Sequence, residues 1–133
     1  LIASQQSAEV GFTITTMDES LARKLEPGAP APDARLKAAL AFASAGVKTW
    51  VFLGPVIFGV NDSEESAEAV VRGAAEAGAR KVIFDYYRAK PLADARMRGL
   101  LGEGFSPRKR APGIEAAARK ACAESGIGFE LAF

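Results

Sequence analysis

The chain has 133 residues, which is enough for one ordinary domain with a real hydrophobic core. Its net charge is +1, from 17 Lys and Arg against 16 Asp and Glu, so the overall charge favours neither nucleic acid nor membrane. With no histidine and one cysteine, the chain alone cannot build Ser-His-Asp or Cys-His nucleophile systems, or a zinc or iron–sulfur site. Any chemistry must come from carboxylates, Lys, Arg, Tyr, hydroxyl groups or an external cofactor.

The single cysteine, Cys122, cannot form an internal disulfide, which suggests a reducing compartment. It lies in an Ala-rich segment, where we expect it to be a small core residue. No apolar run approaches the roughly 20 residues of a membrane span, and no signal-like segment opens the chain. The sequence therefore predicts a cytoplasmic protein without membrane contact.

Strand and helix patterns alternate along the chain. Period-two alternation and β-branched residues predict the strands, whereas apolar residues spaced by three and four predict the helices. Helix–glycine–strand junctions recur at Gly46, Gly78 and Gly126, the first two 32 residues apart (78 − 46), close to one βα unit of about 30 residues. The pattern predicts an α/β fold of parallel βα units. In chain order we expect strand 10–16, short helix 17–25, loop 26–32, helix 32–46, strand 48–53, a helix ending at 78, strand 81–86, helices 94–101 and 114–124, and strand 128–133.

The most informative segment is 54–62, where an apolar strand breaks at Gly-Pro, turns and opens into a helix. Either Asp62 with Glu65, or Ser63 with Ser66, would cap that helix. In parallel sheets this strand-to-helix corner lies on the edge where ligands bind. The segment therefore predicts a ligand-binding edge, although the same turn and cap also serve a purely structural role.

Asp85, Tyr86 and Arg88 lie at the C-terminal end of the expected strand 81–86, where polar residues often meet substrate. Aromatic residues there can also simply fill the end of a barrel. Glu26 and Arg35 favour a loop-fixing ion pair over a catalytic role.

A basic cluster, Arg108-Lys109-Arg110, follows two further arginines, Arg96 and Arg98. Such a cluster contacts phosphates in nucleic-acid-binding proteins. A solvated loop explains it as well.

Residues 12–30, with a strand of alternating hydroxyl side chains, a short helix and Leu-Glu-Pro, resemble the middle of radical SAM enzymes. The nearest likeness is to the spore photoproduct lyase-like (DNA repair photolyase-like) branch, in which an arginine follows, here Arg35. Residues 55–63 are similar to its Pro-Val-Ile-Pro-Gly-(Val/Ile)-Asn-Asp-Ser motif, with Phe58 where proline is usual. The resemblance runs from about Val10 to Tyr86. It implies that residues 1–133 are a single domain, the C-terminal half of a partial (β/α)6 TIM-like barrel.

The resemblance also implies a cofactor, S-adenosylmethionine. In this superfamily a strand with the pattern Ile-x-Gly-x-x-acidic supports the adenine, and Ile57, Gly59 and Asp62 match it, with Val56 and Phe58 beside them. Pro55 stands where the pattern has a leading glycine.

Polar residues of the preceding strand face the ribose or the methionine part in that superfamily, and Thr13 and Thr15 are the matching residues. Strand alternation would point both into the barrel lumen, while Phe12 and Ile14 would pack under helices. Asp85, Tyr86 and Arg88 are the expected substrate residues because of their place at the end of strand 81–86.

The chain also departs from the superfamily. Radical SAM enzymes hold a [4Fe–4S] cluster on a CxxxCxxC loop and grip the methionine amino group with a Gly-Gly-Glu-type element; neither is present here. Residues 1–7 look like the tail of an amphipathic element, so the chain is expected to be a second half that is inactive without its N-terminal half. The parent enzyme would cleave S-adenosylmethionine to a 5′-deoxyadenosyl radical, with nucleic-acid lesions as one possible target.

Two alternatives stay open. The chain could be a non-catalytic α/β ligand-binding or interaction domain that pairs with a second copy as a homodimer through open sheet edges. It could also be an enzyme that uses Asp85, Tyr86 and Arg88 for carboxylate or phosphate chemistry.

Overall fold

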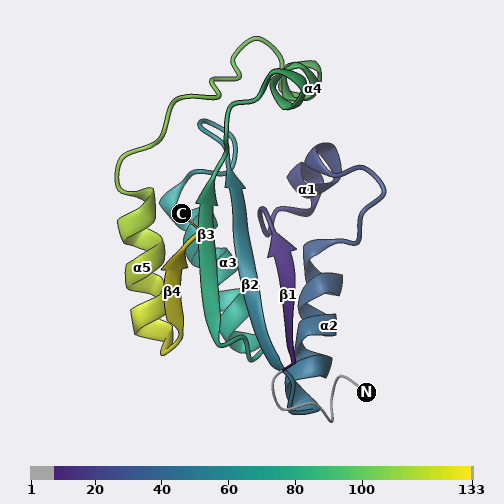
Figure 1. The fold of residues 1–133 in the computed structure, drawn as a ribbon, viewed down its shortest axis with the longest axis vertical. Helices are drawn as coiled ribbons and strands as arrows, with labels where there is room; N and C mark the ends of the chain where they lie inside the picture. Colours follow the sequence, from purple (N-terminus) through teal and green to yellow (C-terminus); the bar gives the residue numbers. More distant parts are fainter. Residues whose placement is uncertain (1–7, 133) are drawn as a thin grey trace.

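The computed structural model describes residues 8–132, so the expectations for residues 1–7 and for residue 133 lie outside it. Strands and helices alternate as the sequence predicts (Figure 1). The elements are β1 (Glu9–Ile14), α1 (Glu19–Leu25), α2 (Pro32–Ser44), β2 (Lys48–Val56), α3 (Glu64–Glu76), β3 (Lys81–Tyr86), α4 (Pro91–Leu101), α5 (Ile114–Ser125) and β4 (Gly128–Leu131).

Within residues 8–132, four strands form one sheet in the order β1-β2-β3-β4, and all neighbours are parallel. The predicted parallel α/β class is therefore confirmed. β1 and β4 are the edges of this open sheet, and its closure into a barrel stays a prediction. All four strands point the same way, and α1 and α4 lie beyond the C-terminal ends of β1 to β3 (Figure 1).

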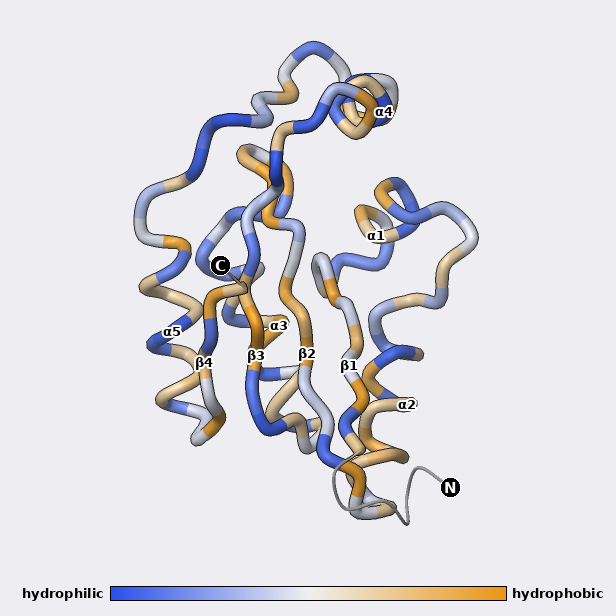
Figure 2. The backbone as a smooth tube through the Cα atoms, in the orientation of Figure 1, coloured by the Kyte–Doolittle hydropathy of each residue, from blue (hydrophilic) through white to orange (hydrophobic). Residues whose placement is uncertain are grey.

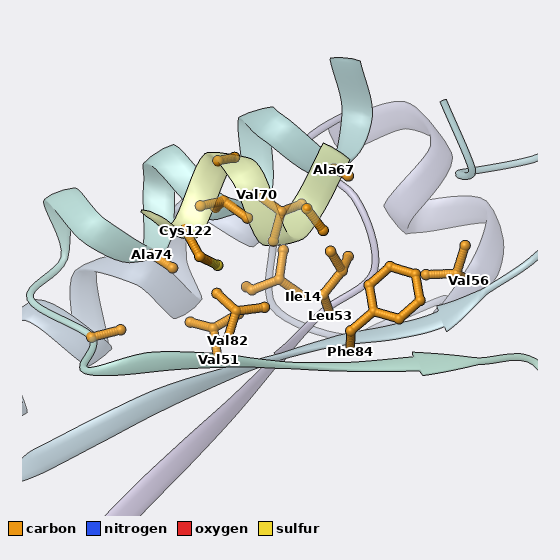
Figure 3. Packing of buried hydrophobic residues seen from close by; sticks show 14 of the residues in the cluster. Ile14, Val51, Leu53, Val56, Ala67, Val70, Ala74, Val82, Phe84 and Cys122 are labelled. Atoms are coloured by element: carbon orange, nitrogen blue, oxygen red, sulfur yellow. The ribbon is translucent and has the colours of Figure 1, made fainter. Parts of the chain in front are cut away.

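The main core lies between one face of the sheet and helices α3 and α5 (Figure 3). Strand alternation places every second residue on this face, and the helices contribute small and branched residues that allow close approach. Cys122 is fully buried here, as predicted. The central members are Ile14, Val51, Leu53, Val82 and Phe84 from the strands, Val70, Val71 and Ala74 from α3, and Ala118 and Cys122 from α5.

The opposite face of the sheet is more open. Trp50, Phe52 and Ile83 of this face are only half-buried, and the Trp50 ring lies across Gly11, where a Cβ atom would overlap it. Lys81 and Glu130 form an ion pair of 2.9 Å on the same face. The nearly continuous apolar sequence of β2 predicts that other segments pack on both faces of the sheet. Within residues 8–132, only the face against α3 and α5 is closely packed.

The corner after β2 differs from the expectation. β2 does not end at Leu53 but continues through Gly54 and Pro55 to Val56, with a cis Gly54–Pro55 bond. The register with β3 shifts between Leu53 and Val56, so the missing proline N–H falls where the ladder is already irregular.

Helix caps follow one of the two predicted alternatives. Ser63, not Asp62, caps α3, because its hydroxyl accepts a 3.0 Å hydrogen bond from the Ser66 N–H. Asp18 caps α1 in the same way, because its carboxylate accepts a 3.1 Å hydrogen bond from the Leu21 N–H. Over the described residues, no helix is long and apolar enough to cross a bilayer.

Candidate functional site

A pocket of about 450 Å³ lies at the C-terminal ends of β1 and β2. It brings together three of the predicted cofactor residues, Thr13, Thr15 and Ile57, from segments about 40 residues apart. Its lining also includes the Leu-Glu-Pro segment and two residues of α4. The full lining is Thr13, Thr15, Leu25, Glu26, Pro27, Ala29, Pro55, Ile57, Arg96 and Met97.

The apolar side of the pocket belongs to a small second core, which we call the satellite cluster. Its buried members are Leu25 of α1, Ile57 of the corner and Phe105 of the loop after α4. Met97 of α4 packs against them and reaches the pocket. This cluster is what positions α1 and α4 beside the strand ends, because it buries apolar side chains from all three segments.

The polar side of the pocket is fixed by Arg35. This guanidinium donates a 2.6 Å hydrogen bond to the Thr13 carbonyl and forms a 3.0 Å ion pair with Glu26. The predicted Glu26–Arg35 pair is therefore confirmed. It ties the loop after α1 to the edge of β1 and holds the Glu26 carboxylate at the pocket rim.

Strand alternation arranges β1 as predicted. Thr13 pairs in register with Phe52 of the open face, whereas Ile14 is buried in the main core and the Phe12 ring lies 6.0 Å from that of Phe42 in α2. Thr15 follows the last residue of β1, is buried and lines the pocket.

Asn61 connects the corner to β1 and is a site residue that the sequence analysis did not single out. Its side chain is 2% exposed and makes hydrogen bonds to Ile57, Thr15 and Pro55, all of which line the pocket. The signal in the sequence was a single amide residue inside a turn between two apolar segments.

The remaining predicted cofactor residues do not line this pocket. Val56 is buried in the main core, and Phe58 is half-buried with the Lys109 ammonium 5.7 Å from its ring centre. Gly59 occupies a turn position with φ of +73°, which favours glycine. Asp62 is half-buried just before α3. Their roles in cofactor binding stay predictions.

The predicted substrate residues do not converge on one point. Asp85 and Arg88 form an ion pair of 2.9 Å. Tyr86 points to the helix-covered face of the sheet. There its hydroxyl lies 3.5 Å from the Glu115 carboxylate, and the Arg110 guanidinium lies 4.2 Å from the centre of its ring. Burial, followed by the charge of Glu115, raises the pKa of Tyr86. Because neighbouring strand residues face opposite sides, a joint role of all three has no geometric support.

Tyr87 anchors the start of α4. Its hydroxyl donates a 2.7 Å hydrogen bond to Asp94, which also accepts from the Lys90 N–H at 3.1 Å. Burial, together with the hydrogen bond to Asp94, raises the pKa of Tyr87 to about 12. The phenol therefore stays protonated near neutral pH and keeps its donor role.

Positive charge is concentrated in residues 87–113, which we call the cap segment. It carries seven Lys and Arg against two Asp and Glu, a net +5, whereas the rest of the chain has ten against fourteen, a net −4. Figure 2 shows the hydrophilic stretch between α4 and α5. Three of its cations lie over aromatic rings: Arg98 over Phe105, Lys109 over Phe58 and Arg110 over Tyr86.

The residues of this chain do not fit an iron–sulfur cluster. Cys122 is the single cysteine, and burial in the main core raises its pKa to about 11, so it stays a thiol at neutral pH. Among residues 8–132 no group of three or more His, Cys, Asp or Glu side chains could hold a metal ion.

Comparisons with known proteins give a match in structure. No family model matches the sequence, and no curated protein matches it. The structure of Streptococcus suis SuiB bound to S-adenosylmethionine superposes with a TM-score of 0.65 at 14% identity, over 98% of this chain and 28% of that one. SuiB bound to the precursor peptide SuiA gives a TM-score of 0.67 at 13% identity, over 99% and 28%.

The chain thus spans 28% of the length of the SuiB chains it matches. At this identity the likeness shows a shared fold. That fold belongs to a protein that binds S-adenosylmethionine, the cofactor implied by the sequence resemblance. The comparison therefore shows the fold alone, and it does not support the spore photoproduct lyase-like branch.

Proposed function

We propose that this chain is the C-terminal part of a radical SAM barrel and that its 450 Å³ pocket supports the adenosine part of S-adenosylmethionine. The observation that carries the proposal is the meeting of Thr13, Thr15 and Ile57 in one pocket at the strand ends. These residues were assigned to the cofactor from the sequence alone. The shared fold with S-adenosylmethionine-bound SuiB supports S-adenosylmethionine as the cofactor.

The lining has the chemistry that an adenosyl group needs. Leu25, Ile57 and Met97 offer apolar contact to a planar ring, and the threonine hydroxyls can hydrogen-bond ribose hydroxyls. Glu26 and Arg96 supply opposite charges, which match the amino and carboxylate groups of the methionine part. The cluster that reacts with this cofactor in the superfamily would be held by the N-terminal half of the same barrel.

Titration of the 133-residue chain with S-adenosylhomocysteine, a stable analogue without the sulfonium methyl group, tests the pocket. We expect saturable binding by calorimetry and at least a tenfold weaker Kd when Thr13 and Thr15 are both changed to Val. As a matched control, Thr49→Val alters a buried threonine at the other end of β2 and should leave the Kd within twofold. No binding by the wild-type chain, or binding unchanged by the double substitution, would remove the pocket from the proposal.

The enzyme hypothesis is tested on the parent protein. Its reading frame should contain an upstream CxxxCxxC motif, and anaerobic reconstitution of the full-length product should yield a [4Fe–4S] cluster and 5′-deoxyadenosine. Absence of that motif would contradict the hypothesis directly.

We also propose that the full-length protein acts on nucleic acid, and the net charge of +5 on the cap segment supports this target. We expect the full-length protein to bind single-stranded DNA with an affinity that falls as salt rises, because phosphate contacts release counterions. Replacing Arg108, Lys109 and Arg110 with Gln should flatten the salt dependence, whereas the Arg23→Gln variant on α1 should not. Binding without salt dependence would contradict this target.

The alternative function, a self-associating binding domain, is favoured by one observation, the half-buried Trp50, Phe52 and Ile83 on the open sheet face. In that case two copies would cover each other's sheets as a homodimer. Light scattering of the 133-residue chain separates the cases: a dimer dissociated by Trp50→Lys supports it, and a stable monomer contradicts it.

A further inference from the structure

Asn61 satisfies three backbone groups that the sheet leaves without partners. Its Oδ1 accepts a 2.7 Å hydrogen bond from the Ile57 N–H, and its Nδ2 donates to the carbonyls of Thr15 at 2.8 Å and Pro55 at 3.0 Å. These bonds use both amide hydrogens and the carbonyl oxygen. Each side-chain group that can hydrogen-bond is thus engaged with the backbone of the pocket.

The place of these bonds explains why they are needed. The pairing of β1 with β2 extends to Ile14 and Leu53, so Thr15 and Pro55 lie just past the last paired residues. Buried backbone groups without partners are costly, and Pro55 has no N–H with which to continue the ladder. The Asn61 side chain supplies the hydrogen bonds that the ladder would otherwise provide. One of them goes to the carbonyl of Thr15, which lies just past β1 and 46 residues earlier in the sequence.

The three contacted residues are those whose position defines the pocket. Thr15 belongs to one wall, and Pro55 and Ile57 belong to the adjoining wall. Since the amide is 2% exposed, it does not meet a ligand itself. It acts by fixing the distance between the β1 wall and the β2 wall.

We propose that Asn61 is the positioning residue of the pocket: it sets the width between Thr15 and Ile57 and thereby the affinity for the adenosyl group. This inference rests on the proposed function for the ligand, whereas the positioning itself is a property of the ligand-free chain. The two parts are separable by experiment.

Two substitutions separate the hydrogen bond that Asn61 accepts from the two that it donates. Asn61→Asp keeps an acceptor for the Ile57 N–H but removes the amide donor, so a carboxylate faces the carbonyls of Thr15 and Pro55. Asn61→Ala removes all three bonds. The matched control is Ser63→Asp, which adds the same charge two residues away at the cap of α3, where Asp is a good N-cap.

The first arm needs no ligand. In ¹⁵N NMR spectra, the short bond to Oδ1 should place the Ile57 amide proton downfield and protect it from exchange. We expect Asn61→Ala to lose both signatures, Asn61→Asp to keep them, and the amides of Val51 and Val82 in the main core to change little in either variant. An unchanged Ile57 signal in Asn61→Ala, or an equal loss of protection in the main core, would overturn the positioning role.

The second arm measures S-adenosylhomocysteine binding at a temperature where all variants are folded. We expect at least a tenfold weaker Kd for Asn61→Asp and Asn61→Ala, and a Kd within twofold of wild type for Ser63→Asp. A Kd within twofold for Asn61→Asp would overturn the effect on affinity. Failure of the wild-type chain to bind would instead count against the proposed function, and the NMR arm would still decide the role of Asn61.

Discussion

The middle of the sheet and its C-terminal end are held together by different kinds of contact. The middle of the helix-covered face is held by the main core, where Val51, Val82 and Phe84 are fully buried against α3 and α5. The C-terminal end is held by the small satellite cluster and by single polar side chains, notably Arg35, Asn61 and Tyr87. Burial of many apolar groups stabilises the scaffold, whereas a few directed bonds position the pocket. We therefore expect changes in the main core to alter stability and changes at the strand ends to alter binding.

The largest effect is expected from Phe84→Ala in the main core. Truncating a fully buried phenylalanine leaves a cavity and should lower the free energy of unfolding by about 3–5 kcal/mol. Phe105→Ala in the satellite cluster should cost less, because several neighbours there are only partly buried. Urea denaturation followed by circular dichroism measures both. An equal or larger loss of stability for Phe105→Ala would contradict the view that the main core, and not the satellite cluster, supplies most of the stability.

Arg35→Gln should have the next largest effect. It removes the bond to the Thr13 carbonyl and the ion pair with Glu26, both partly screened by solvent, for a loss of about 1–2 kcal/mol. We expect the Kd for S-adenosylhomocysteine to weaken more than this change in stability alone explains, because Glu26 loses its anchor. A stability loss with unchanged Kd would show that the pair is only a loop clamp.

Tyr87→Phe should lower stability by about 1 kcal/mol near neutral pH, because one hydrogen bond to Asp94 is lost. Burial and the hydrogen bond to Asp94 raise the pKa of Tyr87 from its ordinary 10.0 to about 12 in the folded chain, so the unfolded chain loses the phenolic proton first. Its contribution is present below about pH 10 and is lost as pH rises toward 12. The difference between wild type and Tyr87→Phe in denaturation midpoints should shrink over that range. A difference that is constant with pH would contradict the raised pKa of Tyr87.

The smallest effect is expected from Arg23→Gln. Arg23 and Glu19 are both exposed and form a one-turn ion pair on α1, so the free energy of unfolding should change by less than about 0.5 kcal/mol. Thermal unfolding at low and moderate salt measures this change. A larger loss would show that α1 depends on surface charge rather than on the satellite cluster.

Local sequence patterns were enough to predict the scaffold. Alternation in β1 and the glycines at 46, 78 and 126 determine the parallel βα order, and the Ser63 and Asp18 caps follow from local chemistry. Thr13, Thr15 and Ile57 were placed in one pocket by their resemblance to a family, and the structure brings them together.

Other features depended on contacts between distant segments. The continuation of β2 through Pro55 depends on a register shift with β3, which no local pattern reveals. The role of Asn61 depends on Thr15, which is 46 residues away. Tyr86 was predicted to act with Asp85 and Arg88 from its position in the sequence. Because side chains alternate along β3, Tyr86 instead lies under Arg110 on the helix-covered face of the sheet.

We propose that the pocket at the ends of β1 and β2 receives the adenosyl group. Mapping S-adenosylhomocysteine binding by ¹⁵N NMR on the 133-residue chain tests this most directly. We expect shift changes concentrated at Thr13, Thr15 and Ile57, and none at Val47 and Lys48, where β2 begins. Changes centred on Trp50 and Phe52 of the open face, or no changes at saturating ligand, would contradict it.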